Sequence, residues 1–453
     1  MNKRGVYLMY QFPDGLYTDV RIEEVYANKI IFQNHELIQN QTKLETGAMI
    51  RIFDGNRWFY SSITDMKGIQ AAIDNLAKMA TPNPEILNHP VVKRFEINQD
   101  SKLNFSQNTV KNVKNEERIQ LLQSYMEVIK AYDCIPMNRL FYTDTYVKKQ
   151  ILSCLGTDVT FDYQNASVSF TITVKVNEHP LSNVYNSYSD TFQGLIGLEY
   201  KAQEFIEKNI DYAKNAVPVE PGTYTCILSP EVAGVFAHES FGHKSEADFM
   251  IGDETMKREW AIGSRVGSDI LNIMDDGNIE GSGYVPYDDE GCKAKKTYLI
   301  KNGILTGRLH SAYTAADLDE EVTGNARAIN FEYEPIVRMT STYIGEGNLT
   351  KEELFEGVTD GIYIEDFSHG SGMTVFTIAP ILAYRIRNGK IAEPLKISVI
   401  TGNVMETLYQ IDGLSNELKI CSSARGGCGK MEQFPLRVSD GGPYVRVKGI
   451  KVQ

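Results

Sequence analysis

The chain has 453 residues, of which 42% are hydrophobic and 23% are charged, a mixture typical of globular proteins that excludes extensive disorder. Its formal net charge of -13 argues against a nucleic-acid partner, because an acidic surface repels phosphate backbones. At about 100–200 residues per domain, the length favours two domains.

Neither secretion nor membrane insertion is indicated by the apolar segments. The first residues, MNKRGVYLMYQFPDG, lack the apolar run of about 7–15 residues that a signal peptide needs. No segment approaches the ~18–20 apolar residues of a membrane span. The six cysteines, at positions 134, 154, 226, 292, 421 and 428, are scattered, so we expect reduced thiols and a cytoplasmic protein without a membrane partner.

The first predicted elements form a hairpin. Residues 20–25 and 49–53 alternate, or nearly alternate, apolar and polar side chains, as strands with one buried face do. Asp54-Gly55-Asn56 is a turn sequence, and the apolar run Trp58-Phe59-Tyr60 follows it. The second strand is therefore predicted to pair with this run.

Three helices and a meander complete the N-terminal part. Thr64-Asp65 is expected to cap the first helix, whose apolar face carries Ile69, Ile73, Leu76 and Ala77. The second helix is predicted over 116–132 and the third over 195–214. Between them, residues 139–176 alternate again and predict an antiparallel meander with a half-buried face.

A domain boundary is predicted at residues 217–222, where two prolines and a glycine interrupt the pattern. The prediction is an α+β chain, with an N-terminal α/β domain over 1–216 that combines an antiparallel sheet with helices. A β-rich domain over 217–453 follows. In it, Asn302-Gly303 and Asn388-Gly389 lie between apolar runs and predict tight type I′ hairpins.

The motif that carries chemistry follows a predicted strand over 224–228. Ser229-Pro230-Glu231 has the features of a helix start, with a capping serine, a proline at the first position and an acid in the first turn. A mostly apolar helix then ends in His238-Glu239-x-x-x-His243. The familiar zinc signature spaces its histidines four apart, on one helix face.

Five residues turn a regular α-helix through roughly 500°, which leaves the two histidines ~140° apart. They can face one ion only if the helix is distorted or ends between them. Gly242, directly before His243, is expected to permit that change of direction. Catalytic zinc takes three protein ligands and one water, so a third ligand is needed.

Cys428 is the sharpest candidate for the third ligand, since glycines flank it and a thiolate binds zinc well. Lys430 is expected to favour the thiolate. A loop cysteine that happens to lie among glycines is the simpler alternative, and Glu246, Asp248 and His369 are weaker candidates. The acidic run at 288–290 suggests calcium, although three consecutive acids usually form a solvated turn.

Several ordered motifs resemble the TldD/PmbA family of microcin-processing and gyrase-modulator proteins. They are HESFGHKSEAD (238–248), MDDG (274–277), YDDEG (287–291), IKNGILTG (300–307), TGNAR (323–327), RMTSTYI (338–344), DGIYI (360–364) and GGCGK (426–430), with looser matches at YTDVRIEE (17–24) and in the hairpin over 49–60. The sequence departs from the family's glycine-rich patterns at 367–372 and 431–435.

The resemblance implies a two-domain chain whose C-terminal part is β-rich and barrel-like and carries the metal-site helix. It implies a homodimer, or a heterodimer with a PmbA/TldE-type subunit. In the family, two histidines and a cysteine in the Cys-Gly-Lys segment hold zinc, which corresponds here to His238, His243 and Cys428. Because the His-Glu-x-x-x-His motif is whole, the chain resembles the active, TldD-type subunit.

The expected activity is zinc-dependent hydrolysis of peptide bonds in unfolded or extended peptides. Glu239 is expected to act as general base on a zinc-bound water. Arg338, Tyr343 and His369 are the candidates for stabilising the oxyanion. The alternatives are a non-catalytic metal-binding modulator or partner subunit, and a hydrolase of small amides.

Overall fold

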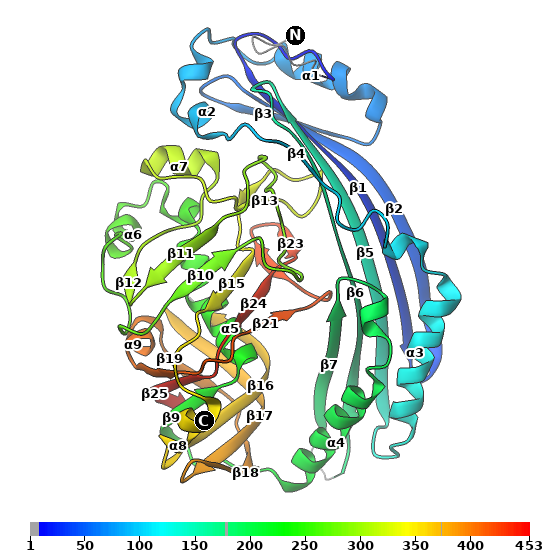
Figure 1. Ribbon diagram of the computed structural model, residues 1–453, viewed down its shortest axis with the longest axis vertical. Coiled ribbons are helices and arrows are strands. Elements are labelled where there is room, and N and C mark those ends of the chain that lie inside the picture. The colour runs from blue at the N-terminus through cyan, green and yellow to red at the C-terminus, as the bar shows by residue number, and fades with distance from the viewer. Residues whose placement is uncertain (1–8, 177–179, 373) are drawn as a thin grey trace.

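A computed structural model describes residues 9–176, 180–372 and 374–453. The expectation of no signal peptide rests partly on residues 1–8, which lie outside this range. Within it, no helix combines the length and the apolar character that crossing a bilayer requires. The helices and strands fall into an N-terminal and a C-terminal half (Figure 1).

The N-terminal half is built on one long, curved, seven-stranded sheet. Its order is β3-β2-β1-β5-β6-β4, and β7 also pairs with β6. The strands are β1 (Tyr17–Gln33), β2 (Glu36–Phe53), β3 (Trp58–Ile63), β4 (Gln99–Lys102), β5 (Met137–Ser153), β6 (Asp158–Val174) and β7 (Leu181–Ser189). The predicted hairpin is confirmed, with Phe53 opposite Trp58, and so is the antiparallel pairing within 139–176, where β5 pairs with β6; β7, beyond that range, continues it.

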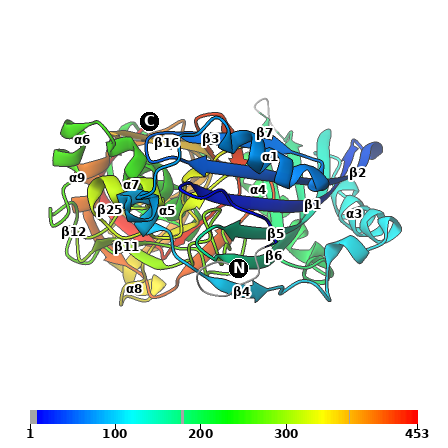
Figure 2. The ribbon, with the colours of Figure 1, turned by 90° about the horizontal axis from the view of Figure 1, so that it is seen from above.

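Four helices accompany this sheet. They are α1 (Ile69–Ala77), α2 (Pro90–Arg94), α3 (Asn115–Lys130) and α4 (Glu199–Asn215), and the apolar periodicity predicts three of them, α1, α3 and α4. Helix α4 begins four residues later than predicted, because residues 193–195 form a 3-10 turn and Gly197 has a φ of 77°. Seen from above, α3 lies at the end of the molecule away from the C-terminal strands (Figure 2).

The C-terminal half contains a closed barrel and a flatter sheet. Strands β16, β9, β25, β19 and β17 pair in that order, and β17 pairs back with β16 to close the barrel. The barrel strands and their neighbours are β8 (Val217–Pro218), β9 (Gly222–Leu228), β16 (Asp360–Gly372), β17 (Val375–Arg387), β18 (Lys390–Lys396), β19 (Ile400–Asn403), β20 (Ile411–Leu414) and β25 (Val445–Val452). This arrangement confirms the expected α+β class with a barrel-like C-terminal part.

The second C-terminal sheet has the order β12-β11-β10-β15-β24-β21. Its strands are β10 (Ile273–Asp276), β11 (Lys296–Lys301), β12 (Ile304–Leu305), β15 (Ser341–Ile344), β21 (Lys419–Ser422) and β24 (Ser439–Gly442). The pairs β13 (Ala326–Arg327) with β14 (Ile336–Val337) and β22 (Cys428–Lys430) with β23 (Gln433–Leu436) stand apart. The remaining helices are α5 (Pro230–Ala237), α6 (Glu254–Glu259), α7 (Ala312–Leu318), α8 (Lys351–Glu356) and α9 (Val404–Tyr409).

Both predicted Asn-Gly hairpins are confirmed. Asn302 and Gly303 have φ angles of 50° and 74°, and Asn388 and Gly389 have φ angles of 50° and 77°. Positive φ at both central residues is the requirement of a type I′ turn. No described strand of the large N-terminal sheet belongs to the C-terminal sheets, so we propose residues 217–222 as the domain junction.

Helix α5 lies between the barrel and the flatter sheet (Figure 1). Its apolar side chains are buried in the main C-terminal core, where Phe236 packs edge-on against Phe376. Gly234 allows the helix to approach β24, because a Cβ atom there would lie 2.5 Å from the backbone nitrogen of Gly441. The barrel and the flatter sheet thus hold α5 from two sides, which fixes the position of its C-terminal end, where His238 follows.

Candidate metal centre

Helix α5 begins as the sequence predicts. Strand β9 ends at Leu228, and the Ser229 hydroxyl accepts a hydrogen bond from the Val232 amide at 3.2 Å. Pro230 occupies the first helical position, where its missing N–H costs nothing. The cap fixes where the helix starts, and so which residues reach its far end.

The helix does not stay α-helical up to the second histidine. Residues His238–Gly242 form one π-helical turn, and the His243 amide donates to the His238 carbonyl, five residues back. A hydrogen bond between residues five apart places their side chains on the same face of the helix. In a regular α-helix the bond joins residues four apart, and side chains five apart face different directions. The imidazole ring centroids lie 5.1 Å apart with perpendicular planes.

The predicted distortion is therefore confirmed, but the predicted reason for Gly242 is wrong. Gly242 has φ -55° and ψ -52°, which any residue adopts. Its lack of a side chain matters for packing, because a Cβ atom would lie 2.1 Å from the Met339 sulfur. The turn comes from the hydrogen-bond pattern, and the glycine lets it pack against Met339.

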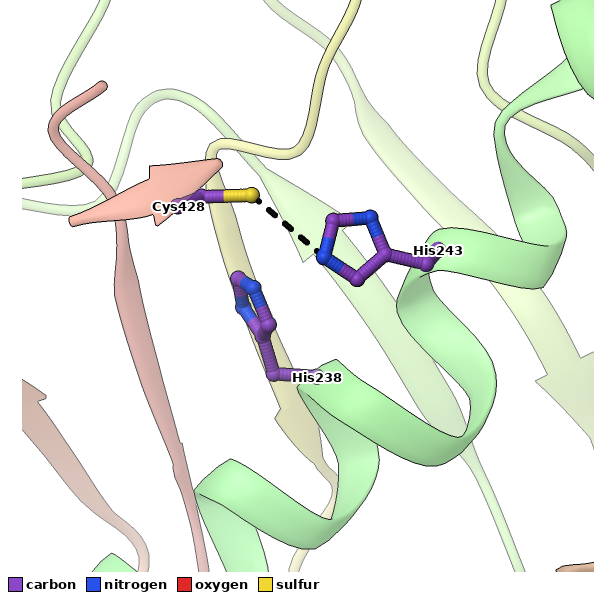
Figure 3. Close-up of side chains that lie close together, drawn as sticks. All are labelled: His238, His243 and Cys428. Atoms are coloured by element: carbon purple, nitrogen blue, oxygen red, sulfur yellow. Dashed lines mark hydrogen bonds between the residues drawn. The ribbon is translucent and has the colours of Figure 1, made fainter. Parts of the chain in front are cut away.

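Cys428 reaches the two histidines from β22 (Figure 3). Its Sγ lies 3.5 Å from His243 Nε2, and one possible ligand atom from each of the three residues lies within 4.8 Å of the others. His238 and Cys428 are buried, and His243 is partly buried. Gly427 is necessary here, since it has a φ of 147° and a Cβ atom would lie 2.4 Å from the Leu436 carbonyl oxygen.

The three side chains perturb one another strongly. Burial alone raises the pKa of the Cys428 thiol, but contact with His238 and His243 outweighs it and lowers that pKa to about 5. Burial lowers the pKa of His243, but Cys428 and Glu246 outweigh it and raise that pKa to about 10. The pKa of His238 is likewise raised despite burial, chiefly through Cys428. The cluster thus favours a thiolate, the form of cysteine that binds metals.

A charged group behind His243 fixes its orientation. The buried Glu246 carboxylate lies 3.1 Å from His243 Nδ1 and 3.1 Å from the Lys430 ammonium. Lys430 also lies 2.5 Å from Asp248. Such carboxylate–histidine contacts are typical of metal sites, where they orient the ring and leave the other nitrogen free for the ion.

The three weaker ligand candidates, Glu246, Asp248 and His369, lie outside the cluster. Among the residues with defined positions, the only group with metal-ligand spacing is His238, His243 and Cys428. Glu246 and Asp248 are engaged as just described, and His369 is exposed and contacts the Ser368 hydroxyl at 2.8 Å. The main groups that lower the pKa of the Cys428 thiol are the two histidines, and Lys430 is held by Glu246 and Asp248.

The donor set fits a zinc ion. Tetrahedral zinc with bonds of about 2.0–2.3 Å needs ligand atoms about 3.6 Å apart, and the observed separations reach that range with small side-chain adjustments. His238 Nδ1 is buried and has no hydrogen-bond partner among the described residues. Two imidazoles and a thiolate leave a fourth position open, which is the pattern of a catalytic rather than a structural zinc site.

Glu239 stands next to this cluster and remains available. It is partly exposed and forms no hydrogen bond or ion pair with the described part of the chain. Strand β16 runs beside it, since a Cβ atom at Gly370 would lie 3.8 Å from Glu239 Cγ. Its place beside a candidate ligand, without a competing partner, suits a group that exchanges protons.

Two of the three candidates for stabilising the oxyanion, Arg338 and Tyr343, are buried. Arg338 is fully buried, and its guanidinium donates to the carbonyls of Cys428 at 2.7 Å and Gln433 at 3.2 Å. An oxyanion role for Arg338 is therefore wrong, because the side chain braces the strand that carries Cys428. Tyr343 is buried beside Lys296, whose ammonium lies 5.8 Å from its ring centroid. Sequence reasoning missed the bracing roles of Arg338 and Lys430, since nothing in their local sequence signals them.

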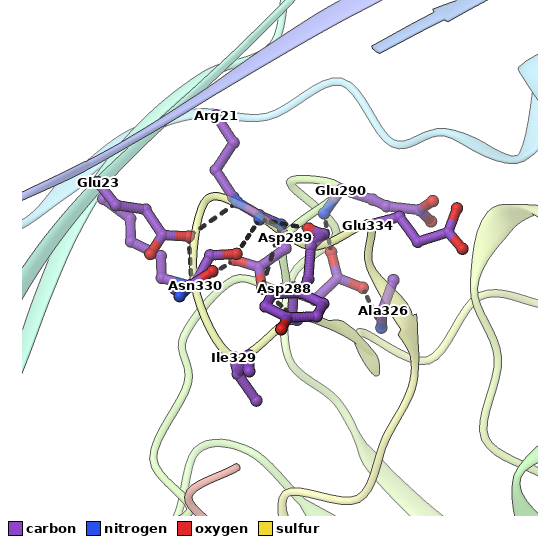
Figure 4. A network of polar contacts seen from close by, with 12 residues as sticks. Arg21, Glu23, Asp288, Asp289, Glu290, Ala326, Ile329, Asn330 and Glu334 are labelled. Carbon is purple, nitrogen blue, oxygen red and sulfur yellow. Dashed lines mark hydrogen bonds and ion pairs between the residues drawn. The ribbon is translucent and has the colours of Figure 1, made fainter. Parts of the chain in front are cut away.

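The acidic run at 288–290 is buried, so the prediction of a solvated turn is wrong (Figure 4). Asp289 lies 2.7 Å from Lys149 and 3.6 Å from Arg21, both on the N-terminal sheet. Glu290 lies 3.1 Å from Arg51, and Asp288 accepts three backbone amides. These carboxylates join the two halves of the molecule and are occupied by protein cations and amides rather than arranged for calcium.

Comparison with known proteins gives the same family for both halves. Residues 221–453 match the PmbA/TldA metallopeptidase C-terminal domain, and residues 18–80 match PmbA/TldA metallopeptidase domain 1. A metalloprotease of Methanocaldococcus jannaschii is 30% identical, over 95% of this chain and 96% of its own. A zinc metalloprotease TldD homolog of Saccharolobus solfataricus is 28% identical, over 96% of both chains.

Solved structures show the same fold. TldE from Thermococcus kodakarensis superposes with a TM-score of 0.76 at 16% identity, covering 96% of each chain. At that identity the likeness establishes the fold alone. The full-length relatives and the matched C-terminal domain show that the chain belongs to the TldD/PmbA family of metallopeptidases.

Proposed function

We propose that His238, His243 and Cys428 hold a zinc ion, and that the chain hydrolyses peptide bonds in extended or unfolded peptides with Glu239 as general base. The observation that carries this proposal is the convergence of three ligand atoms, from segments 185 residues apart, within 4.8 Å. The name of the Saccharolobus solfataricus relative, a zinc metalloprotease, supports the choice of metal.

A zinc ion with an open position polarises a carbonyl and lowers the pKa of water to about 7. Glu239 would transfer the proton in this reaction. It accepts a proton from the attacking water and returns it to the leaving amine, which positioned general bases accelerate by about 10²–10⁴-fold. Glu246 holds the His243 ring in place throughout, and Arg338 holds the backbone of Cys428.

An open cavity lies beside the N-terminal end of helix α5. A cavity of about 580 Å³ lies between β7 of the N-terminal half and β21 of the C-terminal half, and Glu231 of α5 lines it. That volume is of the size that accommodates a small ligand or a few residues of chain, and it excludes a folded domain. Neither the three candidate ligands nor Glu239 lines this cavity, so it bears on the shape of the substrate only through its place beside α5.

The test is a comparison of wild type with Glu239→Gln, and with Glu254→Gln as a control on an exposed glutamate. All three proteins should contain equal zinc by elemental analysis. Wild type and the control should cleave an unfolded protein, and Glu239→Gln should do so 10²–10⁴-fold more slowly. Undiminished cleavage by Glu239→Gln would remove Glu239 as the base, and zinc without any cleavage by wild type would favour a non-catalytic subunit.

We also propose that the working form is a dimer, either of two copies or with a PmbA/TldE-type subunit, and that it acts in the cytoplasm. The shared fold with TldE supports the pairing, and six free cysteines support a reducing compartment. Light scattering of the purified protein, alone and mixed with a TldE-type chain, distinguishes the two assemblies. A monomer in both samples would refute the pairing.

A further inference from the structure

A short loop, residues 423–427, carries the chain from β21 to Cys428. Gly426 has a φ of 77°, and a Cβ atom there would meet nothing within 4 Å, so the glycine serves backbone conformation alone. Consecutive glycines with positive φ give this loop little intrinsic rigidity. The position of the Cys428 sulfur therefore depends both on the pairing of β22 with β23 and on what holds the loop that precedes it.

Both ends of the loop are held within the C-terminal half. The Ser423 amide donates to the Ser282 hydroxyl at 3.2 Å, and Arg338 donates to the Cys428 carbonyl at 2.7 Å. These contacts fix the start of the loop and the backbone after it. Within the loop, the Ser423 hydroxyl donates to the Arg425 carbonyl at 2.8 Å and accepts from the Arg425 amide at 3.1 Å, which leaves the Arg425 side chain for contacts outside it.

The middle of the loop is held by the N-terminal half, through Arg425. Its guanidinium carbon lies 3.7 Å from the centroid of the Phe141 ring on β5, and its Nη1 donates to the Ser169 hydroxyl on β6 at 3.2 Å. A second cation, Arg139, lies 5.1 Å from the same ring, and its charge opposes Arg425. Arg425 of the C-terminal half thus contacts Phe141 of the N-terminal half although the charge of Arg139 opposes it.

A neighbouring contact reinforces this link. Asn186 on β7 donates to the Ser422 carbonyl at 3.1 Å, so a third N-terminal strand holds the residue that precedes the loop. Asn186 and Ser422 also line the cavity of about 580 Å³ described above. The loop that bears the cysteine thus rests on three strands of the N-terminal sheet.

We propose that Arg425 is a positioning residue that sets the place of the Cys428 sulfur, and so the affinity for the metal, by tying the glycine loop to the N-terminal sheet. The inference rests on the proposed zinc site. Arg425 is partly buried, and a guanidinium–aromatic contact of that kind changes an equilibrium by roughly three- to thirtyfold, which we expect to appear as weaker zinc binding in Arg425→Ala.

The test compares Arg425→Ala with Arg437→Ala. Arg437 is the matched control, because its guanidinium lies 3.7 Å above the Tyr163 ring of the same sheet, but it stands beyond β23 and outside the loop. Zinc affinity is measured by chelator competition, and cobalt substitution reports the thiolate bond through its charge-transfer absorption. Arg425→Ala should bind zinc about tenfold more weakly with a weaker or shifted band, Arg425→Lys should recover part of both, and Arg437→Ala should match wild type.

A variant of the partner side keeps the proposal falsifiable if Arg425→Ala misfolds. Phe141→Leu removes the ring from the opposite half and should also weaken zinc, whereas saturating zinc should restore its cleavage rate. Unchanged affinity and an unchanged cobalt band in both variants would overturn the proposal. If instead Cys428→Ala binds zinc as wild type does, the zinc site itself is wrong, and the two failures are distinguished.

Discussion

Glu246 offers the sharpest test of how the metal centre is held. Its carboxylate is fully buried and lies 3.1 Å from both His243 Nδ1 and the Lys430 ammonium. Burial raises the pKa of Glu246, but His243 and Lys430 lower it more, so the group stays ionised. Removing it frees the imidazole to rotate and, within the described residues, leaves the buried Lys430 with Asp248 as its remaining carboxylate partner.

The magnitude follows from these contacts. Loss of such a supporting group costs about 10–100-fold in metal affinity, or about 1.4–2.8 kcal/mol. Glu246→Gln keeps an oxygen that accepts from the ring N–H and loses only the charge, so we expect about tenfold. Glu246→Ala loses both and should approach a hundredfold.

The measurement is the zinc dissociation constant of wild type, Glu246→Gln and Glu246→Ala, obtained by competition with a chromophoric chelator. Thermal unfolding of the metal-free proteins separates lost affinity from lost structure. Glu254→Gln is the control, because its side chain is 86% exposed and its ion pair with Lys257 is worth little. Zinc affinity for Glu246→Ala within twofold of wild type would refute the idea that this carboxylate orients the ligand.

Two further predictions follow. Asp289→Asn and Lys149→Met should each destabilise the fold to urea by about 3–5 kcal/mol, because each removes one charge from the buried, neutral cluster of Arg21, Glu23, Lys149 and Asp289 and leaves a net charge in it. The double variant should lose clearly less than the sum, since the neutral pair Arg21–Glu23 remains; strict additivity would contradict this reasoning. Metal-free protein should show the ultraviolet absorbance of one thiolate above pH about 5, lost on acidification through that value and missing in Cys428→Ser, since the pKa of Cys428 is about 5. An absorbance that appears only near the ordinary cysteine pKa of about 8.5 would contradict it.

Much of the framework is predictable because its signals are local. Ser229 and Pro230 indicate the start of α5, because serine caps a helix and proline suits its first position. The two Asn-Gly pairs predict their turns, because both residues readily adopt positive φ. The apolar spacing over 116–132 locates α3, because one face of that helix packs on the sheet. In each case a few neighbouring residues contain the physical cause.

The rest depends on groups far apart in the chain. The spacing of His238 and His243 demands a distortion, but only the surrounding packing, including Met339, decides that it is a π turn. Buried acids at 288–290 look like a solvated turn until the cations of β1, β2 and β5 are placed beside them. Arg338, too, gains its bracing role only once the strand of Cys428 is adjacent.

The π turn between the histidines has an evolutionary consequence. Such turns correspond to one extra residue inserted into a helix. A signature with five-residue spacing is therefore separated from one with four-residue spacing by a change in chain length, which no series of substitutions provides. Deleting one residue between Glu239 and His243 would restore α-helical spacing, and it would also rotate and shift everything that follows, including Glu246. The five-residue signature of this chain is thus tied to the residues that follow it, including Glu246.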